Sequence, residues 1–157
     1  MKLEWINHTG FVVNDMERSL VFYHDLLGLE IERDAILEGE FISQVVGFPN
    51  TKLRGVYLGL GDMRHSLELI QYLNPPGYRS ASMERNAIGA SHLGIIVDNV
   101  EVFYQKLSQN GCQFVNPPAF RDSPYPWARK ACYLSDPDGN WLEAIERSPA
   151  PTGSTQV

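Results

Sequence analysis

The chain has 157 residues, 43% of them hydrophobic, and a formal charge of −6 at pH 7. A chain of this length can bury the core of one ordinary domain without disulfides or a structural metal. The net negative charge and the lack of Lys/Arg runs exclude nucleic acid and anionic membranes as expected partners. The absence of an 18-residue apolar stretch and of an apolar signal core near the start predicts a cytoplasmic protein.

The first part of the chain predicts a βαβββ module over residues 5–73. Residues 6–13 are rich in β-branched and apolar side chains and are typical of a strand. Asn14 or Asp15 can cap the following helix, which carries an apolar stripe over residues 16–27 and is ended by Gly28. The remaining predicted elements are strands at 29–33, 53–60 and 66–72, and an insertion at 34–52 with a short helix at 41–47.

A linker rich in proline, glycine and small polar residues is expected at 74–90, and the same order of elements then repeats over 91–147. Residues 136–139 read Asp-Pro-Asp-Gly, which is typical of a hairpin turn because proline presets φ and glycine permits a positive φ. The predicted elements are a strand at 92–97, a helix at 100–110, and strands at 112–115, 129–135 and 140–146. The two modules form one domain, 1–147, and the tail 148–157 is expected to be disordered.

Two histidines and two glutamates occupy matching places in the two modules. His8 and His92 open the repeated segments HTGFVVND and HLGIIVDN, and a Leu-Glu-x-Ile segment near the end of each module supplies Glu68 and Glu143. Because side chains alternate along a strand, all four can line the sheet face that the helices leave uncovered. We therefore expect an α+β fold in which two tandem βαβββ modules form an open, concave sheet around a metal site.

This donor set is suited to one divalent metal ion, such as Zn, Ni, Co, Mn or Fe. A single strand histidine is usually a packed or capping side chain, so the inference depends on the joint correspondence. Descent from a duplicated ancestor, with the metal lost from one module, is the alternative. His24 and His65 have no counterpart of this kind and are expected to be solvated.

The sequence resembles the vicinal oxygen chelate superfamily, which includes glyoxalase I, methylmalonyl-CoA epimerase, extradiol dioxygenases and the fosfomycin and bleomycin resistance proteins. The resemblance covers residues 5–147. It implies metal ligands at His8, Glu68, His92 and Glu143, and a homodimer whose site is formed within one chain or from modules of two chains. The motifs that carry it are INHTGFVVNDMERSLVFYHDLLGLEI, HSLELIQY, ASHLGIIVDNVEVFYQKL and YLSDPDGNWLEAIE.

The resemblance implies a metal-dependent lyase or isomerase of glyoxalase I or epimerase type, acting by metal-stabilised enolisation of a small carbonyl or thioester. A thiol conjugate or a CoA ester fits this substrate class. Glu143 is the first candidate for the catalytic base and Glu68 the second. The epimerase's additional glutamate base has no clear match, and Glu38 and Glu40 are candidates for it.

Two alternatives stay open at this point. The first is an extradiol-type dioxygenase, in which Glu68 would not bind the metal, and the second is a non-catalytic protein that binds a drug or metabolite. Aromatic and basic residues in 120–130, Arg129 and Lys130 among them, form a lid over an anionic substrate in one interpretation and an ordinary packed loop in the other.

Overall fold

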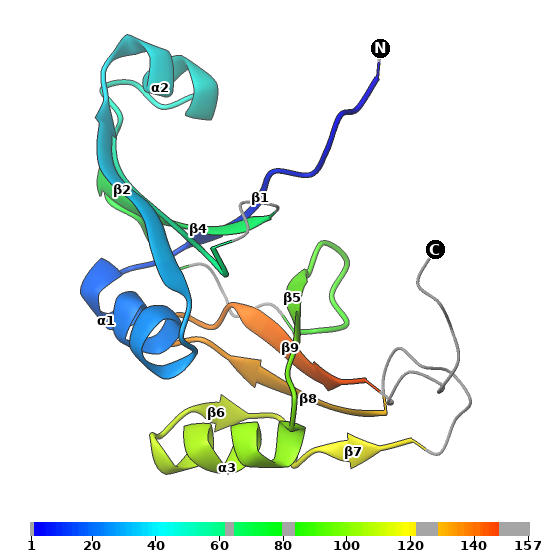
Figure 1. The fold of residues 1–157 in the computed structure, drawn as a ribbon. Coiled ribbons are helices and arrows are strands. Elements are labelled where there is room, and N and C mark those ends of the chain that lie inside the picture. The colour runs from blue at the N-terminus through cyan, green and yellow to red at the C-terminus, as the bar shows by residue number, and fades with distance from the viewer. Residues whose placement is uncertain (1, 62–64, 80–83, 122–128, 148–157) are drawn as a thin grey trace. The chain divides into compact units, whose positions relative to one another are not determined.

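The structure, a computed structural model, describes residues 2–61, 65–79, 84–121 and 129–147. The chain divides into two compact units, unit 1 (Met1–Ser82) and unit 2 (Met83–Val157). Each unit contains its own open sheet with few helices (Figure 1), so the α+β prediction is confirmed. In the described part of the chain, no helix is long and apolar enough to span a membrane.

Unit 1 follows the predicted βαβββ order. The strands lie in the order β1-β4-β3-β2, with β1 parallel to β4 and the other neighbours antiparallel. The Asp15 side chain accepts a hydrogen bond from the Arg18 N–H and caps the helix, and Gly28 ends it at φ 82°. The elements are β1 (His8–Val12), α1 (Met16–Leu20), a π-helical continuation η1 (Val21–Leu26), β2 (Glu30–Glu38), α2 (Glu40–Val46), β3 (Lys52–Gly59) and β4 (Ser66–Asn74).

One face of the unit 1 sheet packs against the first helix and forms the core. Alternate residues of the strands point to this face, and their apolar side chains are buried together with those of the helix. The buried side chains are Phe11, Met16, Phe22, Tyr23, Val56, Leu58, Leu67 and Leu69. The opposite face therefore receives the other half of each strand, including the candidate ligands.

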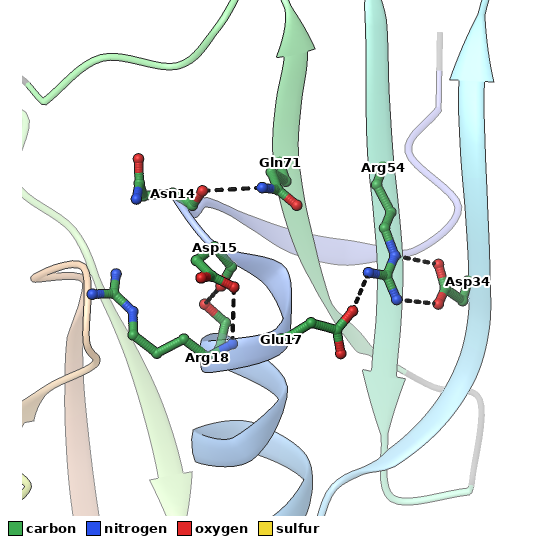
Figure 2. Close-up of polar contacts among 8 residues, drawn as sticks. Asn14, Asp15, Glu17, Arg18, Asp34, Arg54 and Gln71 are labelled. Carbon is green, nitrogen blue, oxygen red and sulfur yellow. Dashed lines mark hydrogen bonds and ion pairs between the residues drawn. The ribbon is translucent and has the colours of Figure 1, made fainter.

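A network of charged side chains also connects the helix to the helix-facing side of the sheet (Figure 2). The Arg54 guanidinium donates to both carboxylate oxygens of Asp34, at 2.9 and 2.6 Å, and to Glu17 at 2.5 Å. These contacts join β3 to β2 and to α1. The hydrogen bond from Arg54 holds the pKa of the Asp34 carboxyl below its usual value. The Gln71 amide adds a bond to the Asn14 carbonyl, 3.0 Å away (Figure 2).

The prediction for residues 34–52 was wrong in one respect. The strand expected at 29–33 continues to Glu38 and pairs with β3 down to the partners Glu38 and Lys52, so the first residues of the supposed insertion belong to the sheet. Main-chain pairing with β3 stabilises this extension although its sequence, residues 34–38, does not alternate apolar and polar side chains. The connection then forms α2, which lies at the end of β2 remote from α1 (Figure 1).

Unit 2 repeats this arrangement in the strand order β5-β9-β8-β6, with β5 parallel to β9. The Asn99 side chain accepts from the Val102 N–H to cap the helix, and Gly111 follows the helix at φ 80°. A short strand, β7, was not predicted and pairs with β8. The elements are β5 (His92–Ile96), α3 (Val100–Gln109), β6 (Gln113–Phe114), β7 (Ala119–Phe120), β8 (Lys130–Ser135) and β9 (Trp141–Glu146).

The core of unit 2 lies between α3 and one face of its sheet, where Val100, Leu107, Leu134 and Leu142 are fully buried. The predicted hairpin turn between β8 and β9 is present. Buried Asp136 accepts hydrogen bonds from the N–H groups of residues 138 and 140, and Gly139 has a φ of 94°.

Candidate metal site

In unit 1, His8 and Glu68 face each other across neighbouring strands. Glu68 is the register partner of Gly10 on β1, two residues beyond His8, so both side chains lie on the face opposite the helix. Nε2 of His8 lies 3.1 Å from a Glu68 carboxylate oxygen. Nδ1 of His8 lies 2.7 Å from the Asn7 amide oxygen, which can only accept, so Nδ1 donates to it while Nε2 faces the Glu68 carboxylate.

Glu68 lies in a confined space. It is 8% exposed. Its register partner on β1 is Gly10, and Gly55 on β3 pairs with Ile70, two residues further along β4. A Cβ at Gly55 would lie 3.4 Å from one carboxylate oxygen, and a Cβ at Gly10 would lie 3.9 Å from the other. Tyr57 is the register partner of Glu68 on β3. Burial, followed by hydrogen bonding to Glu68, raises the pKa of Tyr57 to about 12.

In unit 2, His92 and Glu143 form the equivalent pair. Gly94 on β5 is the register partner of Glu143, and Nε2 of His92 lies 3.3 Å from a carboxylate oxygen of Glu143. The side chain of Glu143 is 26% exposed, compared with 10% for the side chain of Glu68. The register partner of Glu143 on β8 is again a tyrosine, Tyr133, but its hydroxyl lies 3.1 Å from Nε2 of His92. Burial and then the charge of Glu143 raise the pKa of Tyr133.

Neither tyrosine was predicted from the sequence to belong to the site. A signal for them was present, because each module contains Tyr-Leu shortly before its Leu-Glu-x-Ile segment, at Tyr57 and at Tyr133. The antiparallel pairing converts this sequence repeat into a spatial one, since each tyrosine lies directly opposite its glutamate. The duplicated site therefore contains three side chains in each unit rather than two.

The donor atoms of each pair have the spacing that a metal ion requires. Zn and similar ions bind nitrogen and oxygen ligands at about 2.0–2.2 Å, so two adjacent ligand atoms lie roughly 3.0–3.5 Å apart. The observed separations of 3.1 and 3.3 Å fall in this range. His8 with Glu68 and His92 with Glu143 thus each fit as two neighbouring ligands of a divalent ion.

The described residues contain no group of three or more His, Cys, Asp or Glu side chains that could hold an ion together. Each pair lies within one of the two compact units. A single ion shared by His8, Glu68, His92 and Glu143 therefore stays a prediction.

The other histidines and glutamates considered in the sequence analysis have different partners. Nδ1 of His24 bonds to the Leu29 carbonyl at 2.6 Å, and Nε2 of His65 bonds to the Thr9 hydroxyl at 3.0 Å. The remaining two are surface carboxylates, since Glu38 pairs with Lys52 at 2.9 Å and Glu40 accepts from the Gln44 amide at 3.0 Å.

Lys130, one of the basic residues of the expected lid, pairs with carboxylates of its own unit. Lys130 lies 2.6 Å from the Glu101 carboxylate at the start of α3 and 3.9 Å from Glu146, on the helix side of the sheet. It is therefore engaged in the same way as Arg54 in unit 1. Residues 122–128 of the expected lid lie outside the described residues.

A carboxylate that the sequence analysis overlooked, Glu32, also lies on the ligand face of unit 1. The β2–β3 register shifts between Ile31 and Arg33, so Glu32 lies at a β-bulge, which can redirect a side chain. The side chain extends over Gly59, where a Cβ would lie 2.0 Å from a carboxylate oxygen, and accepts from the Ser66 hydroxyl at 2.6 Å. Sequence periodicity could not find Glu32, because the bulge exists only in the paired sheet.

The family model described as Glyoxalase/Bleomycin resistance protein/Dioxygenase superfamily matches residues 5–144. The chain belongs to this superfamily. The predicted resemblance to the vicinal oxygen chelate proteins is thereby confirmed. Among solved structures, a glyoxalase family protein from Bacillus cereus has a similar fold, with a TM-score of 0.82, 21% identity, and coverage of 95% of this chain and 97% of that one.

Curated relatives in this superfamily include proteins with and without a known activity. The uncharacterized protein YwbC of Bacillus subtilis is 25% identical, covering 90% of this chain and 97% of that protein. Lactoylglutathione lyase of Schizosaccharomyces pombe is 26% identical over 90% of this chain, and mitochondrial methylmalonyl-CoA epimerase of Mus musculus is 28% identical over 69% of it. The matches span only 44% of the lyase and 54% of the epimerase.

Proposed function

We propose that the chain is a divalent-metal-dependent lyase or isomerase that enolises a small carbonyl or thioester substrate, with His8, Glu68, His92 and Glu143 as metal ligands. The observation that carries this proposal is the repeated imidazole-carboxylate spacing of 3.1 Å in unit 1 and 3.3 Å in unit 2. The names of two relatives support the substrate class, because lactoylglutathione and methylmalonyl-CoA are both acyl thioesters with a hydrogen on the α-carbon.

A bound divalent ion would supply a Lewis acid that stabilises the negative charge on the substrate's enolate oxygen. The chain's own task is to move a proton. Glu143 accepts the α-proton while the electron pair of the C–H bond moves toward the carbonyl oxygen. The protonated carboxyl then returns the proton to the adjacent carbon, as in a lyase of the glyoxalase I type, whereas an epimerase needs a second group that protonates the same carbon from the opposite face.

The four-ligand assignment favours enolisation over oxygen chemistry. A two-histidine, one-carboxylate site leaves more open positions on iron for oxygen and a bidentate substrate. In this chain Glu68 lies beside His8 with the spacing of a ligand, so we include it in the metal site. The superfamily also includes dioxygenases and resistance proteins, and the experiment is designed to separate these activities.

The test is α-proton exchange in deuterated water. Metal-loaded protein is incubated with S-lactoylglutathione or with methylmalonyl-CoA, and loss of the α-proton signal is followed by proton NMR. We expect exchange with one of the two thioesters, none after chelation, and no oxygen uptake at an oxygen electrode. Exchange with neither thioester would contradict the proposal, and oxygen uptake with a catechol would replace it with dioxygenase chemistry.

The Glu143→Gln variant tests the proton carrier. The amide can still offer an oxygen to the ion but cannot accept the proton. We therefore expect the exchange rate to fall by more than the metal affinity does, with both measured on the same preparation. Normal exchange in Glu143→Gln would move the base elsewhere, with Glu68 the next candidate.

A further inference from the structure

An arginine lies over an aromatic ring on the ligand face of unit 2, the sheet face that carries His92 and Glu143. Trp141 is the register partner of His92 and lies two residues before Glu143 on β9, so its indole is on the same face as both candidate ligands. The guanidinium carbon of Arg85 lies 4.7 Å from the centroid of the Trp141 ring. Because the ring quadrupole attracts a cation over its face, this contact holds the Arg85 side chain beside the candidate metal site.

The Arg85 guanidinium is available to a ligand. Among the residues that the structure describes, no carboxylate forms an ion pair with it. Lys130, in contrast, lies 2.6 Å from the Glu101 carboxylate on the helix-facing side of the same sheet. The chain has 19 acidic and 13 basic residues, so acidic partners are plentiful, yet Arg85 is unpaired and exposed. Its N–H donors are therefore accessible from solvent.

The charge of Arg85 also acts on the candidate site. Burial and then the charge of Glu143 raise the pKa of the Tyr133 hydroxyl, and the charge of Arg85 acts in the opposite direction. That hydroxyl lies 3.1 Å from Nε2 of His92. The guanidinium therefore contributes positive potential where the histidine, the glutamate and the tyrosine of unit 2 meet.

We propose that Arg85, held over Trp141, binds a carboxylate on the acyl part of the thioester substrate. This inference rests on the proposed function and narrows its substrate class to acyl thioesters that carry a carboxylate near the α-carbon. The guanidinium suits this group, because its planar fork donates two parallel N–H···O bonds that match the geometry of a carboxylate. Trp141 restricts the arginine, which reduces the side-chain entropy lost when the carboxylate binds.

The strand spacing favours the acyl part of the substrate over the thiol part. Alternate residues of a strand lie about 7 Å apart, so Trp141 and the guanidinium above it are displaced from Glu143 by about this distance. In the proposed reaction Glu143 accepts the proton of the α-carbon. A carboxylate bonded to that carbon lies within this separation, whereas the peptide carboxylates of a glutathione conjugate are many bonds away.

The first experiment measures binding and does not require turnover. Methylmalonyl-CoA and propionyl-CoA, which differ by the acyl carboxylate, are titrated into the metal-loaded wild type and Arg85→Gln by isothermal titration calorimetry. We expect Arg85→Gln to bind methylmalonyl-CoA at least about 10-fold more weakly, because hydrogen bonds between charged groups are lost. Its affinity for propionyl-CoA should stay within about twofold of the wild type, because this ester lacks the carboxylate.

Lys106→Gln is the matched control for the loss of one positive charge. Lys106 is an exposed residue of α3, and α3 packs on the face of the sheet opposite the candidate ligands. This variant should therefore bind both CoA esters as the wild type does. An equal loss of methylmalonyl-CoA affinity in Lys106→Gln would reduce the role of Arg85 to general charge and overturn the proposal.

Three further results of the titration would overturn the proposal. Unchanged methylmalonyl-CoA binding in Arg85→Gln would exclude the arginine from the substrate site. An equal loss for both CoA esters would assign it to the CoA phosphates. A loss confined to S-lactoylglutathione, titrated in parallel, would assign it to a peptide carboxylate.

The second experiment separates recognition of the carboxylate from a structural role. Arg85→Lys keeps the charge but not the bidentate geometry, so it should bind methylmalonyl-CoA at least about threefold more tightly than Arg85→Gln and more weakly than the wild type. Both variants should keep the Co²⁺ affinity and visible spectrum of the wild type, because Arg85 is not a metal ligand. A changed Co²⁺ spectrum in Arg85→Gln, or no recovery in Arg85→Lys, would overturn the proposal. If the wild type exchanges neither thioester, the proposed function fails, and the binding titrations still decide the role of Arg85.

Discussion

The two units present the same three side-chain types on the same strands and in the same register, yet in different surroundings. In unit 1 the glutamate is buried beside its tyrosine, whereas in unit 2 the glutamate is more exposed and the tyrosine contacts the histidine. Strand register sets which side chains meet, because it fixes which positions lie opposite each other. Exposure and polar contacts then distinguish two carboxylates that occupy equivalent positions.

On the helix-facing side of each sheet, too, the two units place similar side chains at equivalent positions but with different contacts. Arg54 on β3 bonds to Glu17 near the start of α1, and Lys130 on β8 bonds to Glu101 near the start of α3. Each cation lies three positions before the site tyrosine of its own unit. The guanidinium also engages both oxygens of Asp34, whereas the ammonium reaches its second carboxylate, Glu146, only at 3.9 Å.

The largest expected effect comes from the histidines, which test whether both units contribute to one ion. His8→Ala and His92→Ala should each lower divalent-metal affinity by at least about 100-fold, because loss of a ligand costs more than loss of a group that orients one. Metal analysis of the purified variants measures this. His24→Ala and His65→Ala are the controls and should retain full metal content. Full content in either ligand variant would show that its unit does not contribute.

Metal removal should have the next largest effect. An ion present at about 100 times its dissociation constant stabilises the fold by about 2.7 kcal/mol, which corresponds to a melting-temperature shift of roughly 5–10 °C for a chain of this size. Thermal unfolding with and without chelator measures the shift. His8→Ala provides the control, since chelator should leave its melting temperature unchanged. If chelator also left the melting temperature of the wild type unchanged, this result would argue against a metal that binds the folded chain.

The helix-side contacts should have a smaller effect. Arg54→Met should lower stability at pH 7 by about 1 kcal/mol, because a bidentate guanidinium-carboxylate contact exceeds an ordinary surface ion pair even when its partners are partly exposed. Lys130→Met should lower it less, because the ammonium makes one close contact. Chemical denaturation of the two variants compares them. A larger loss in Lys130→Met would contradict the comparison drawn from the contact geometry.

The smallest expected effect is the pH dependence of the stability difference between the wild type and Arg54→Met. Arg54 lowers the pKa of Asp34 below its ordinary value, so the contact contributes stability that is fully present above about pH 4 and is lost as pH falls through the lowered pKa. The stability gap between wild type and Arg54→Met should be constant from about pH 5 to 8 and shrink below about pH 4. Melting temperatures at pH 7 and pH 3 test this, and an undiminished gap at pH 3 would exclude the Asp34 contact as its source.

Much of the fold could be predicted because its signals are local. The helix caps Asp15 and Asn99, the glycines that follow the two helices, and the turn at Gly139 all act through neighbours within a few residues. The duplicated histidine and glutamate positions were also readable, because alternation along a strand assigns each side chain to a face. The superfamily assignment follows from the same repeated segments.

The features that could not be predicted depend on pairing between distant strands. The extension of β2 to Glu38 is stabilised by β3, and the bulge that directs Glu32 toward Ser66 exists only in that paired ladder. The placement of Tyr57 opposite Glu68 depends likewise on the β3–β4 register. Residue identity along the chain thus specified the candidate ligands, and tertiary packing decided their burial and partners, because those depend on which strands lie side by side.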